Sequence, residues 1–272
     1  IDIGKVAVKN MYANILRPEN DTAFNYQFIM NAFAGATKDT TIIADTAALK
    51  ISFKKLILDD IRLKFTDNYA GNIFTANIKN AVANLNQFQP DRMRFGLDDF
   101  TASGIGFNMI TIKDIPASAT TDTTAFNLFL NAGKMNLTDI KVVYQNKVNG
   151  MYYANNIKRL EVTKTNLDLA AENAALGDIV LYSSSIQFTA PKLATHSAAD
   201  SVTINNNWKL AINQLLLKND VAVYDDNNIV PKPGFDYSHI GLSKINVSTG
   251  KIYYSADSIL ADIRQLAFAD KS

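Results

Sequence analysis

The chain has 272 residues and a mass of 29.9 kDa, with 47% hydrophobic and 19% charged residues, a composition that excludes intrinsic disorder. Lys and Arg total 27 against 26 for Asp and Glu, and this balance argues against a nucleic-acid binder, which needs a concentrated basic face. Cysteine is absent, so disulfides, thiol nucleophiles and thiolate metal sites are excluded. The two histidines, His196 and His239, lie far apart in the sequence. We therefore expect a protein that is not an enzyme.

The chain begins at Ile1 without a basic segment followed by an apolar one, the pattern of a secretory signal. Its apolar runs are far shorter than the roughly 20 residues that a membrane-spanning helix requires. We expect a processed or excised piece whose anchor or export signal lay upstream.

Alternation of apolar and polar residues, typical of half-buried strands, recurs along the chain. One stretch places Leu56 and Leu58, then Ile61, Leu63 and Phe65, two residues apart, with a three-residue step between the two runs. Such a step indicates a bulge or tight turn that resets the alternating face. Similar runs recur at 93–97, 105–109, 135–137, 157–162, 186–188, 210–217, 240–247 and 252–254. The pattern predicts an all-β chain.

Two segments are compatible with helix. Tyr26, Ile29, Met30 and Phe33 share one helical face and predict a short helix over 24–33, whereas 259–266 is better interpreted as a strand. Segments 34–48, 116–124 and 193–207 are rich in small and polar residues and predict long surface loops.

An internal repeat organises these runs. Leu56, Met135 and Leu215 each precede an aromatic residue by nine positions, and these aromatic residues recur at intervals of 79 and 80. A run of small residues followed by Ile and then an aromatic residue also occurs at 101–107, 182–188 and 248–254. We predict one continuous elongated domain made of a partial leading repeat (1–48, with Val6, Val8 and Ile15 as a shorter copy) and three blocks (49–115, 125–192 and 208–272).

Stacked blocks of this kind would continue one sheet and one apolar surface along an axis. The predicted fold is an elongated, twisted antiparallel sheet, curved like a taco shell into a groove with an apolar concave face. The alternative is a closed sandwich with a dry core, since antiparallel sheets usually bury one face.

The segment Asp21–Phe33, whose sequence includes FNYQFIMNAF, resembles the TamB-type translocation and assembly module proteins of the AsmA-like superfamily, in the versions found in Bacteroidota. The block Ile51–Asp67 and its third copy, Leu210–Asp226, are similar to the family's strand blocks, and the tail from Phe235 to Phe268 resembles the stretch before a further repeat. The likeness covers most of the chain as a repeated pattern.

This resemblance implies a β-sheet groove that crosses the periplasm of a Gram-negative bacterium. Family members carry phospholipid between the inner and outer membranes and assist outer-membrane protein assembly. It implies an inner-membrane anchor through an N-terminal helix, and a C-terminal region that meets an outer-membrane assembly protein of the BamA or TamA type; this chain contains neither part. The expected ligands are phospholipid acyl chains, with no cofactor, metal or nucleic acid. The alternative function is a surface protein that binds partners or glycan.

The expected groove lining follows the inward alternation of the strands. Its candidate residues are Phe53, Leu58, Leu63, Phe65, Phe95, Ile105, Phe107, Leu137, Tyr144, Ile186, Phe188, Ile212, Leu217, Tyr224, Ile252 and Tyr254.

Other chemistry-bearing residues have simpler explanations. The acidic pairs at 59–60, 98–99 and 225–226 lack the spacing of a calcium loop, and Asp is common in turns. His239 follows Ser238, but neighbouring strand residues point to opposite faces and no nucleophile motif is present. Gly104 and Gly106 lack the third glycine of a dinucleotide loop. Trp208 is expected to pack at a strand end, and Lys54 and Lys55 to lie on a solvated face.

Overall fold

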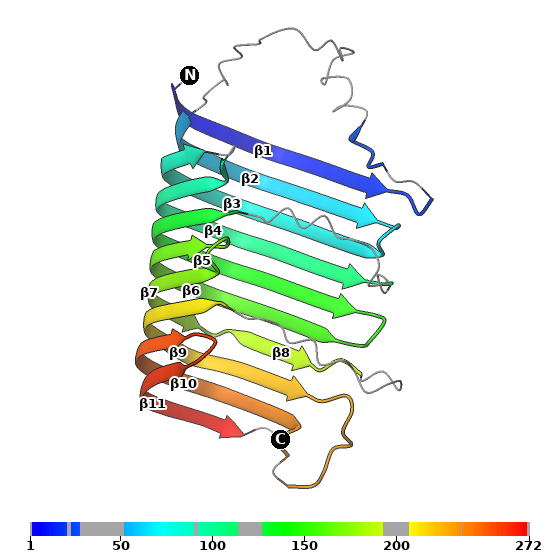
Figure 1. Ribbon diagram of the computed structural model, residues 1–272, viewed down its shortest axis with the longest axis vertical. Helices are drawn as coiled ribbons and strands as arrows, with labels where there is room; N and C mark the ends of the chain where they lie inside the picture. The colour runs from blue at the N-terminus through cyan, green and yellow to red at the C-terminus, as the bar shows by residue number, and fades with distance from the viewer. Residues whose placement is uncertain are drawn as a thin grey trace.

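The computed structural model describes residues 2–20, 23–27, 52–89, 92–113, 127–192, 207–234 and 236–270. These residues form one 11-stranded sheet, in which each strand lies beside the next along the long axis of the molecule (Figure 1). The strands are β1 (Asp2–Arg17), β2 (Ser52–Asp67), β3 (Asn72–Gln89), β4 (Arg94–Thr111), β5 (Phe129–Asn146), β6 (Tyr152–Asp168), β7 (Asn173–Tyr182), β8 (Ser185–Thr189), β9 (Lys209–Asp225), β10 (His239–Tyr254) and β11 (Ile259–Asp270). The predicted all-β, elongated fold is confirmed.

Strand directions follow a period of three. β3 is antiparallel to both β2 and β4, β10 is antiparallel to both β9 and β11, and β6 pairs antiparallel with β5 and with both β7 and β8. At each junction between such groups the pairing is parallel, as in β4 with β5 and in β7 and β8 with β9. The sheet is therefore mixed, where the sequence pattern predicted an antiparallel one.

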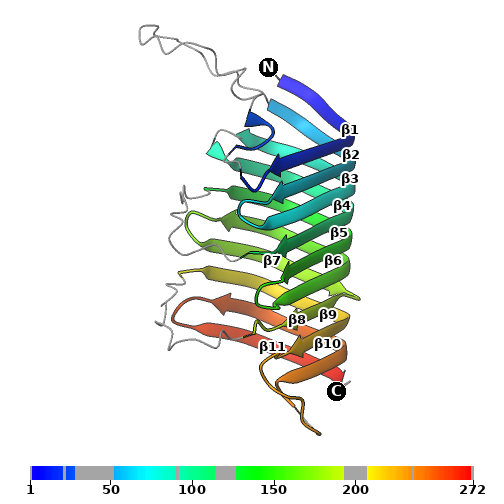
Figure 2. The same cartoon turned by 90° about the vertical axis from the view of Figure 1, so that its right-hand side faces the viewer.

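Each long strand bends near its middle, so the sheet folds lengthwise into a trough with two limbs (Figures 1 and 2). A row of residues with positive φ crosses the sheet at this bend, and we call it the fold line. It consists of Asn10, Asp60, Gly104, Asp139, Ser183, Asn219 and Lys244. We call the half of the sheet that contains Phe53 the first limb and the half that contains Phe65 the second limb.

The fold line explains the three-residue step in the sequence. A left-handed residue such as Asp60 (φ 49°) inserts one position into the alternation, so that Leu58 before it and Ile61 after it face the same side. Asn and Asp tolerate this conformation better than other non-glycine residues. At Gly104 a side chain is also sterically excluded, because a Cβ there would lie 2.7 Å from the Cβ of Lys79.

Asn219 offers a direct test of the fold line. It has φ 59° and an exposed side chain. We expect Asn219→Val to lower the free energy of unfolding by about 1–2 kcal/mol, because a β-branched residue is strained in the left-handed region. Asn219→Gly, the matched control, should leave it unchanged or slightly raised. Urea unfolding of the two variants measures the difference, and equal midpoints would contradict a left-handed requirement at the bend.

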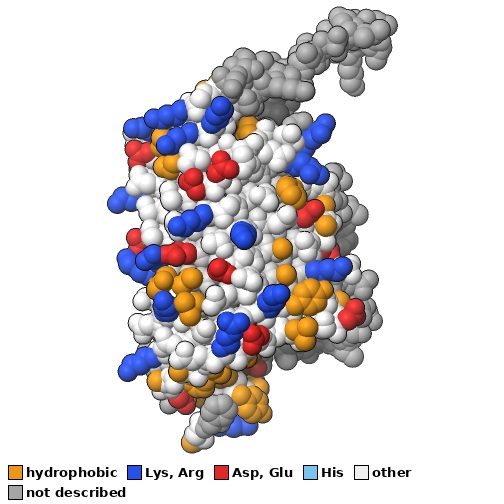
Figure 3. Space-filling view, turned by 90° about the vertical axis from the view of Figure 1, so that its left-hand side faces the viewer, with side chains coloured by type: hydrophobic (Ala, Val, Ile, Leu, Met, Phe, Trp, Pro, Cys, Tyr) orange, Lys and Arg blue, Asp and Glu red, His pale blue; other side chains and the backbone are white. Residues whose placement is uncertain are grey.

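The two faces of the sheet differ in polarity. The row Lys5, Lys55, Asn84, Asp99, Lys134, Thr163, Asp178 and Gln214 is polar throughout and belongs to the outer, convex face. Figure 3 shows the convex side, where charged side chains of both signs are scattered and hydrophobic ones occur in small groups. The apolar rows alternate with the polar ones, so they face the concave side.

Three details of the predicted repeat differ from the structure. β1 pairs with β2 in parallel, as β4 does with β5, so β1 corresponds to the last strand of a three-strand group and not to the first. Its Val6, Val8 and Ile15 have the spacing of Leu56, Leu58 and Phe65 because each lies beside its counterpart in the β1–β2 pairing. The segment 248–254 lies in the middle strand of its group, so it is not equivalent to 101–107. Segment 182–188 spans the β7–β8 break and places its Ile186 one row nearer the strand tip than Ile105.

Several predicted segments fall wholly or mainly outside the described residues. Of the predicted helix, 24–27 form a turn in which the N–H of Gln27 donates to the carbonyl of Phe24 at 2.9 Å, and 28–33 are not described. The loops predicted at 34–48 and 116–124 also lie outside, as does almost all of 193–207. The strand predicted near the C-terminus is β11.

Candidate functional site: an apolar trough

An uninterrupted row of aliphatic side chains crosses the concave face. These residues are register partners from one strand to the next, and we call them the deep row. They are Val8, Leu58, Ala81, Ala102, Leu137, Leu160, Leu181, Leu217, Val247 and Leu266. At about 4.8 Å between strands, this row is about 43 Å long. It lies on the first-limb side of the fold line.

A second row, the aromatic row, lies near the tip of the second limb. Its members are Ile15, Phe65, Phe74, Met109, Tyr144, Tyr153, Phe188, Tyr224 and Ile240. The rings of Phe65 and Phe74 stack with centroids 4.7 Å apart, and those of Phe188 and Tyr224 stack at 6.1 Å. Such ring pairs add about 0.5–1.5 kcal/mol each beyond the area that they bury.

The apolar face is not plugged. Within the described residues, no large side chain is fully buried, and the small core consists mainly of alanines such as Ala81 and Ala132. The other residues of the deep and aromatic rows are half-buried, except for the exposed Leu266. An apolar surface of this length without a covering layer is what a ligand-binding groove requires.

The register assigns the predicted lining residues to rows of the sheet, and most of these rows belong to this apolar face. Phe65, Tyr144, Phe188 and Tyr224 belong to the aromatic row, and Leu58, Leu137 and Leu217 to the deep row. Leu63, Phe107 and Ile186 lie one row below the aromatic row, and Ile105 lies beside the fold line. Phe53, Phe95, Ile212, Ile252 and Tyr254 lie toward the tip of the first limb. Contact of these residues with lipid stays a prediction.

β3 contributes aromatic residues to this face that the sequence pattern did not predict. Phe74 stacks on Phe65, and Phe88 lies 4.2 Å from Phe53 between ring centroids. β3 is rich in Asn and Ala, which hid its alternation. The signal was present, because Ile78 and Ala81 show the same three-residue step as the other strands.

A polar pair lies on the apolar face beside the β7–β8 break. The carboxylate of Asp220 accepts hydrogen bonds from the backbone N–H and the hydroxyl of Ser184, both at 2.6 Å. Both side chains are buried, and Asp220 Oδ2 has no hydrogen-bond partner in the described part of the chain. The Asp220 carboxylate thus accepts a hydrogen bond from the Ser184 N–H, which lies at the strand break and has no neighbouring strand to pair with.

A buried ion pair closes the second limb at the β1–β2 end. Arg17 Nε donates to Asp67 Oδ1 at 2.8 Å, and a second guanidinium nitrogen contacts Asp67 Oδ2. Burial disfavours the charged carboxylate, but the hydrogen bonds from Arg17 and from the N–H of Ala70 prevail and lower the pKa of Asp67. The Arg17 guanidinium also lies over the rings of Phe24 and Tyr69, 4.8 and 4.9 Å from their centroids.

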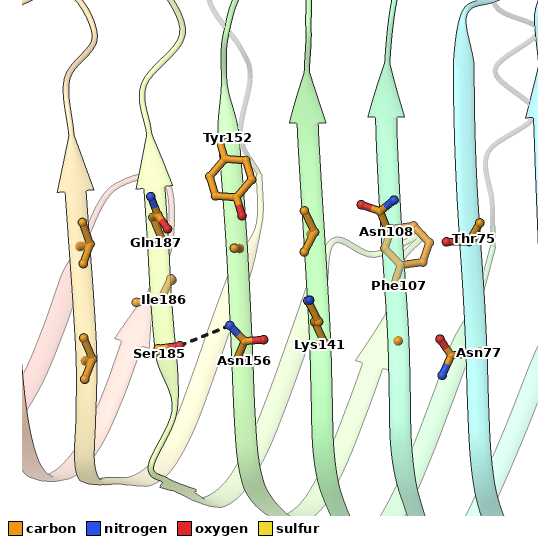
Figure 4. Close-up of a pocket in the computed structure, with 15 residues that line it drawn as sticks. Thr75, Asn77, Phe107, Asn108, Lys141, Tyr152, Asn156, Ser185, Ile186 and Gln187 are labelled. Carbon is orange, nitrogen blue, oxygen red and sulfur yellow. Dashed lines mark hydrogen bonds between the residues drawn. The ribbon is translucent and has the colours of Figure 1, made fainter.

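A hollow with a volume of about 570 Å³ lies on the outer face of the second limb (Figure 4). Thr75, Asn77, Asn108, Lys141 and Asn156 are among the residues that line it. Phe107 contributes to its wall, but it alternates with Asn108 along β4, so its ring belongs to the trough side. Polar and apolar side chains both line the hollow, which lies on the opposite side of the sheet from the aromatic row.

The acidic pairs have structural partners. Asp59 accepts a hydrogen bond from Asn80 at 3.0 Å, Asp60 pairs with Arg62, and Asp98 accepts from Asn86 at 2.7 Å. The described residues hold no group of three or more His, Asp or Glu side chains that could bind a metal ion.

His239 anchors the long β9–β10 connection. Its Nδ1 lies 2.5 Å from Asp225 Oδ1, and its Nε2 lies 2.9 Å from the carbonyl oxygen of Ile229. The hydrogen bond with Asp225 raises the pKa of His239. These contacts account for the histidine as a structural residue.

No helix in the described ranges has the length and apolar character needed to cross a membrane. Comparison with known proteins gives no family: no family model, no curated protein and no solved structure matches the chain. The trough geometry and the sequence pattern are therefore the basis for a functional proposal.

Proposed function

We propose that this chain is a non-enzymatic segment of a TamB-like or AsmA-like bridge protein of the bacterial envelope. In this role it conducts phospholipid between the inner and outer membranes through its apolar trough, assists outer-membrane protein assembly, or does both. The periplasmic location and the membrane partners at either end belong to this proposal. The observation that carries it is the deep row, whose aliphatic side chains run from β1 to β11 without a polar residue.

The energetics support such a conduit. Each methylene of an acyl chain costs about 0.8 kcal/mol to expose to water, so a lipid leaves a bilayer readily only where another apolar surface receives it. One leaflet of a bilayer core is about 15 Å thick, half of the full core. The trough is roughly three such lengths from end to end. A lipid could therefore move along it without returning its chains to water.

The alternative of a surface protein with a dry sandwich core has less support. A sandwich needs two packed sheets, whereas the described strands form a single sheet. Its binding aromatics would lie in loops, whereas the stacked rings of Phe65, Phe74, Phe188 and Tyr224 lie within strands.

A photo-crosslinking amino acid tests lipid contact directly. Phe107 and Asn108 are neighbours in β4 and lie on opposite faces of the sheet. We expect a photo-crosslinker at Phe107 to capture phospholipid in cells and one at Asn108 to capture little or none. Mass spectrometry of the gently purified wild-type chain should find bound phospholipid. Absence of lipid from both the purified protein and the Phe107 adduct would rule out the conduit.

A further inference from the structure

The tip of the second limb has the polarity profile of a membrane interface. Two residues beyond the aromatic row, on the same face, the side chains become polar. This polar row consists of Arg17, Asp67, Asn72, Thr111 and Asn146, which are register partners. Thr111 donates to the side-chain oxygen of Asn72 at 3.0 Å, so the polar groups also interact with one another. From β1 to β5, the sequence of layers along this limb is thus aliphatic, aromatic, then polar.

The tip of the first limb lacks this profile. The row nearest its end includes Phe53, Phe95, Leu130, Leu167 and Leu210. Each of Leu130, Leu167 and Leu210 is followed, two positions nearer the tip, by another apolar residue. These residues are Leu128, Leu169 and Trp208, and all three are half-buried. The backbone N–H of Leu169 donates to the carbonyl of Leu128 at 2.9 Å, which places these two residues side by side. This rim stays apolar where the other becomes polar.

The aromatic row presents hydroxyl groups at the boundary. Tyr144 and Tyr224 are half-buried, and no hydrogen bond of either hydroxyl to another described residue is found. A tyrosine at such a boundary keeps its ring in the apolar layer and its hydroxyl among polar groups. The hydroxyls are therefore free to donate to a phosphate or ester oxygen.

The depth of the second limb suits one acyl chain. Four residues separate Phe65 in the aromatic row from Ile61 at the fold line, a rise of about 13 Å. The acyl chain of one leaflet spans about 15 Å. A headgroup at the aromatic row would thus place the chain end near the bottom of the trough.

We propose that phospholipid lies in the trough with one fixed orientation: the headgroup at the Tyr144–Tyr224 rim and the acyl chains directed toward the fold line and the first limb. This inference rests on the proposed function and specifies how the trough holds its cargo. It assigns Tyr144 and Tyr224 as headgroup contacts and places Trp208 on the tail side.

The single tryptophan of the chain makes the orientation measurable. The probe is phosphatidylcholine that carries a spin label either on the headgroup or at the end of an acyl chain, presented as vesicles to the purified chain. Trp208 in the wild type reports the first rim, and the double variant Trp208→Phe, Phe188→Trp reports the second, because Phe188 lies beside Tyr224 in the aromatic row. Because quenching requires close approach, we expect Trp208 to be quenched about threefold more by the tail label, and the tryptophan at 188 about threefold more by the headgroup label.

The outcomes separate the two proposals. Equal quenching by both labels, or the reverse preference, would overturn the fixed orientation and leave the conduit in place. Stronger headgroup quenching at Trp208 would instead assign the headgroup to the first rim, where Arg92 and Arg94 line a hollow of about 580 Å³. No quenching at either position, together with no bound phospholipid by mass spectrometry, would overturn the conduit itself. Urea unfolding of the double variant checks that it is folded.

Discussion

Leu137→Asp is expected to reduce the phospholipid bound per protein about tenfold or more. Leu137 lies in the deep row between Ala102 and Leu160. A carboxylate there would interrupt the apolar path at its middle, and a charge in a hydrocarbon environment costs about 2.5–3.5 kcal/mol even on the most lenient scale. Asp is the appropriate replacement because its short side chain cannot extend its charge to solvent as Lys can.

Asn136→Asp is the matched control for this prediction. Asn136 is the preceding residue of β5 and faces the outer side, so the same charge is added without reaching the trough. Phosphorus analysis of the purified variants gives the lipid content, and urea unfolding shows whether each variant is folded. If folded Leu137→Asp protein bound as much lipid as Asn136→Asp protein, the deep row would not be the lipid path.

Arg17→Met is expected to lower the free energy of unfolding by about 3 kcal/mol, because it leaves the carboxylate of Asp67 buried without its partner. The Arg17 and Asp67 side chains are only 20% and 6% exposed. Arg62→Met removes the equivalent partner from the exposed Asp60 and should lower the free energy of unfolding far less, because solvent screens that pair. Urea unfolding at neutral pH measures both changes, and similar losses in the two variants would contradict a special role for burial.

The pH dependence of the Arg17 effect has a definite sign. The pKa of Asp67 is lowered in the folded chain. Its contribution is therefore fully present above the ordinary carboxyl pKa of about 3.9 and is lost as the pH falls through the lower folded value. The difference between the wild type and Arg17→Met should shrink over this acidic range. A difference that grew on acidification would contradict the ion pair as its source.

Much of the fold could be predicted from the sequence because apolar and polar residues alternate clearly in strands such as β2. Leu56, Leu58, Ile61, Leu63 and Phe65 indicate a strand with one apolar face and a reset in its middle, and β2 has both features. The register then assigns Leu58, Leu137 and Leu217 to one row and Phe65, Tyr144 and Tyr224 to another row of the same face. Local alternation determines which side a residue faces, and that is the part of the site that could be foreseen.

Strand direction and neighbours could not be predicted in this way. A residue such as Leu137 pairs with Ala102 in a parallel neighbour and with Leu160 in an antiparallel one, and its own sequence does not distinguish the two. β3 was missed because alanine fills its inward positions at 76, 81 and 83. The FNYQFIMNAF segment, the most specific part of the family resemblance, falls mainly outside the described residues, so the resemblance stays a prediction.

The bend at the fold line makes the two dimensions of the trough independent. Its depth depends on how many residues separate a left-handed position such as Asp60 from the strand tip, whereas its length depends on how many strand triplets the chain contains. Each added triplet extends the path by about 14 Å without changing its cross-section. Evolution or protein engineering could thus change the length of the trough by duplicating whole units, while point insertions in the strands would change its depth.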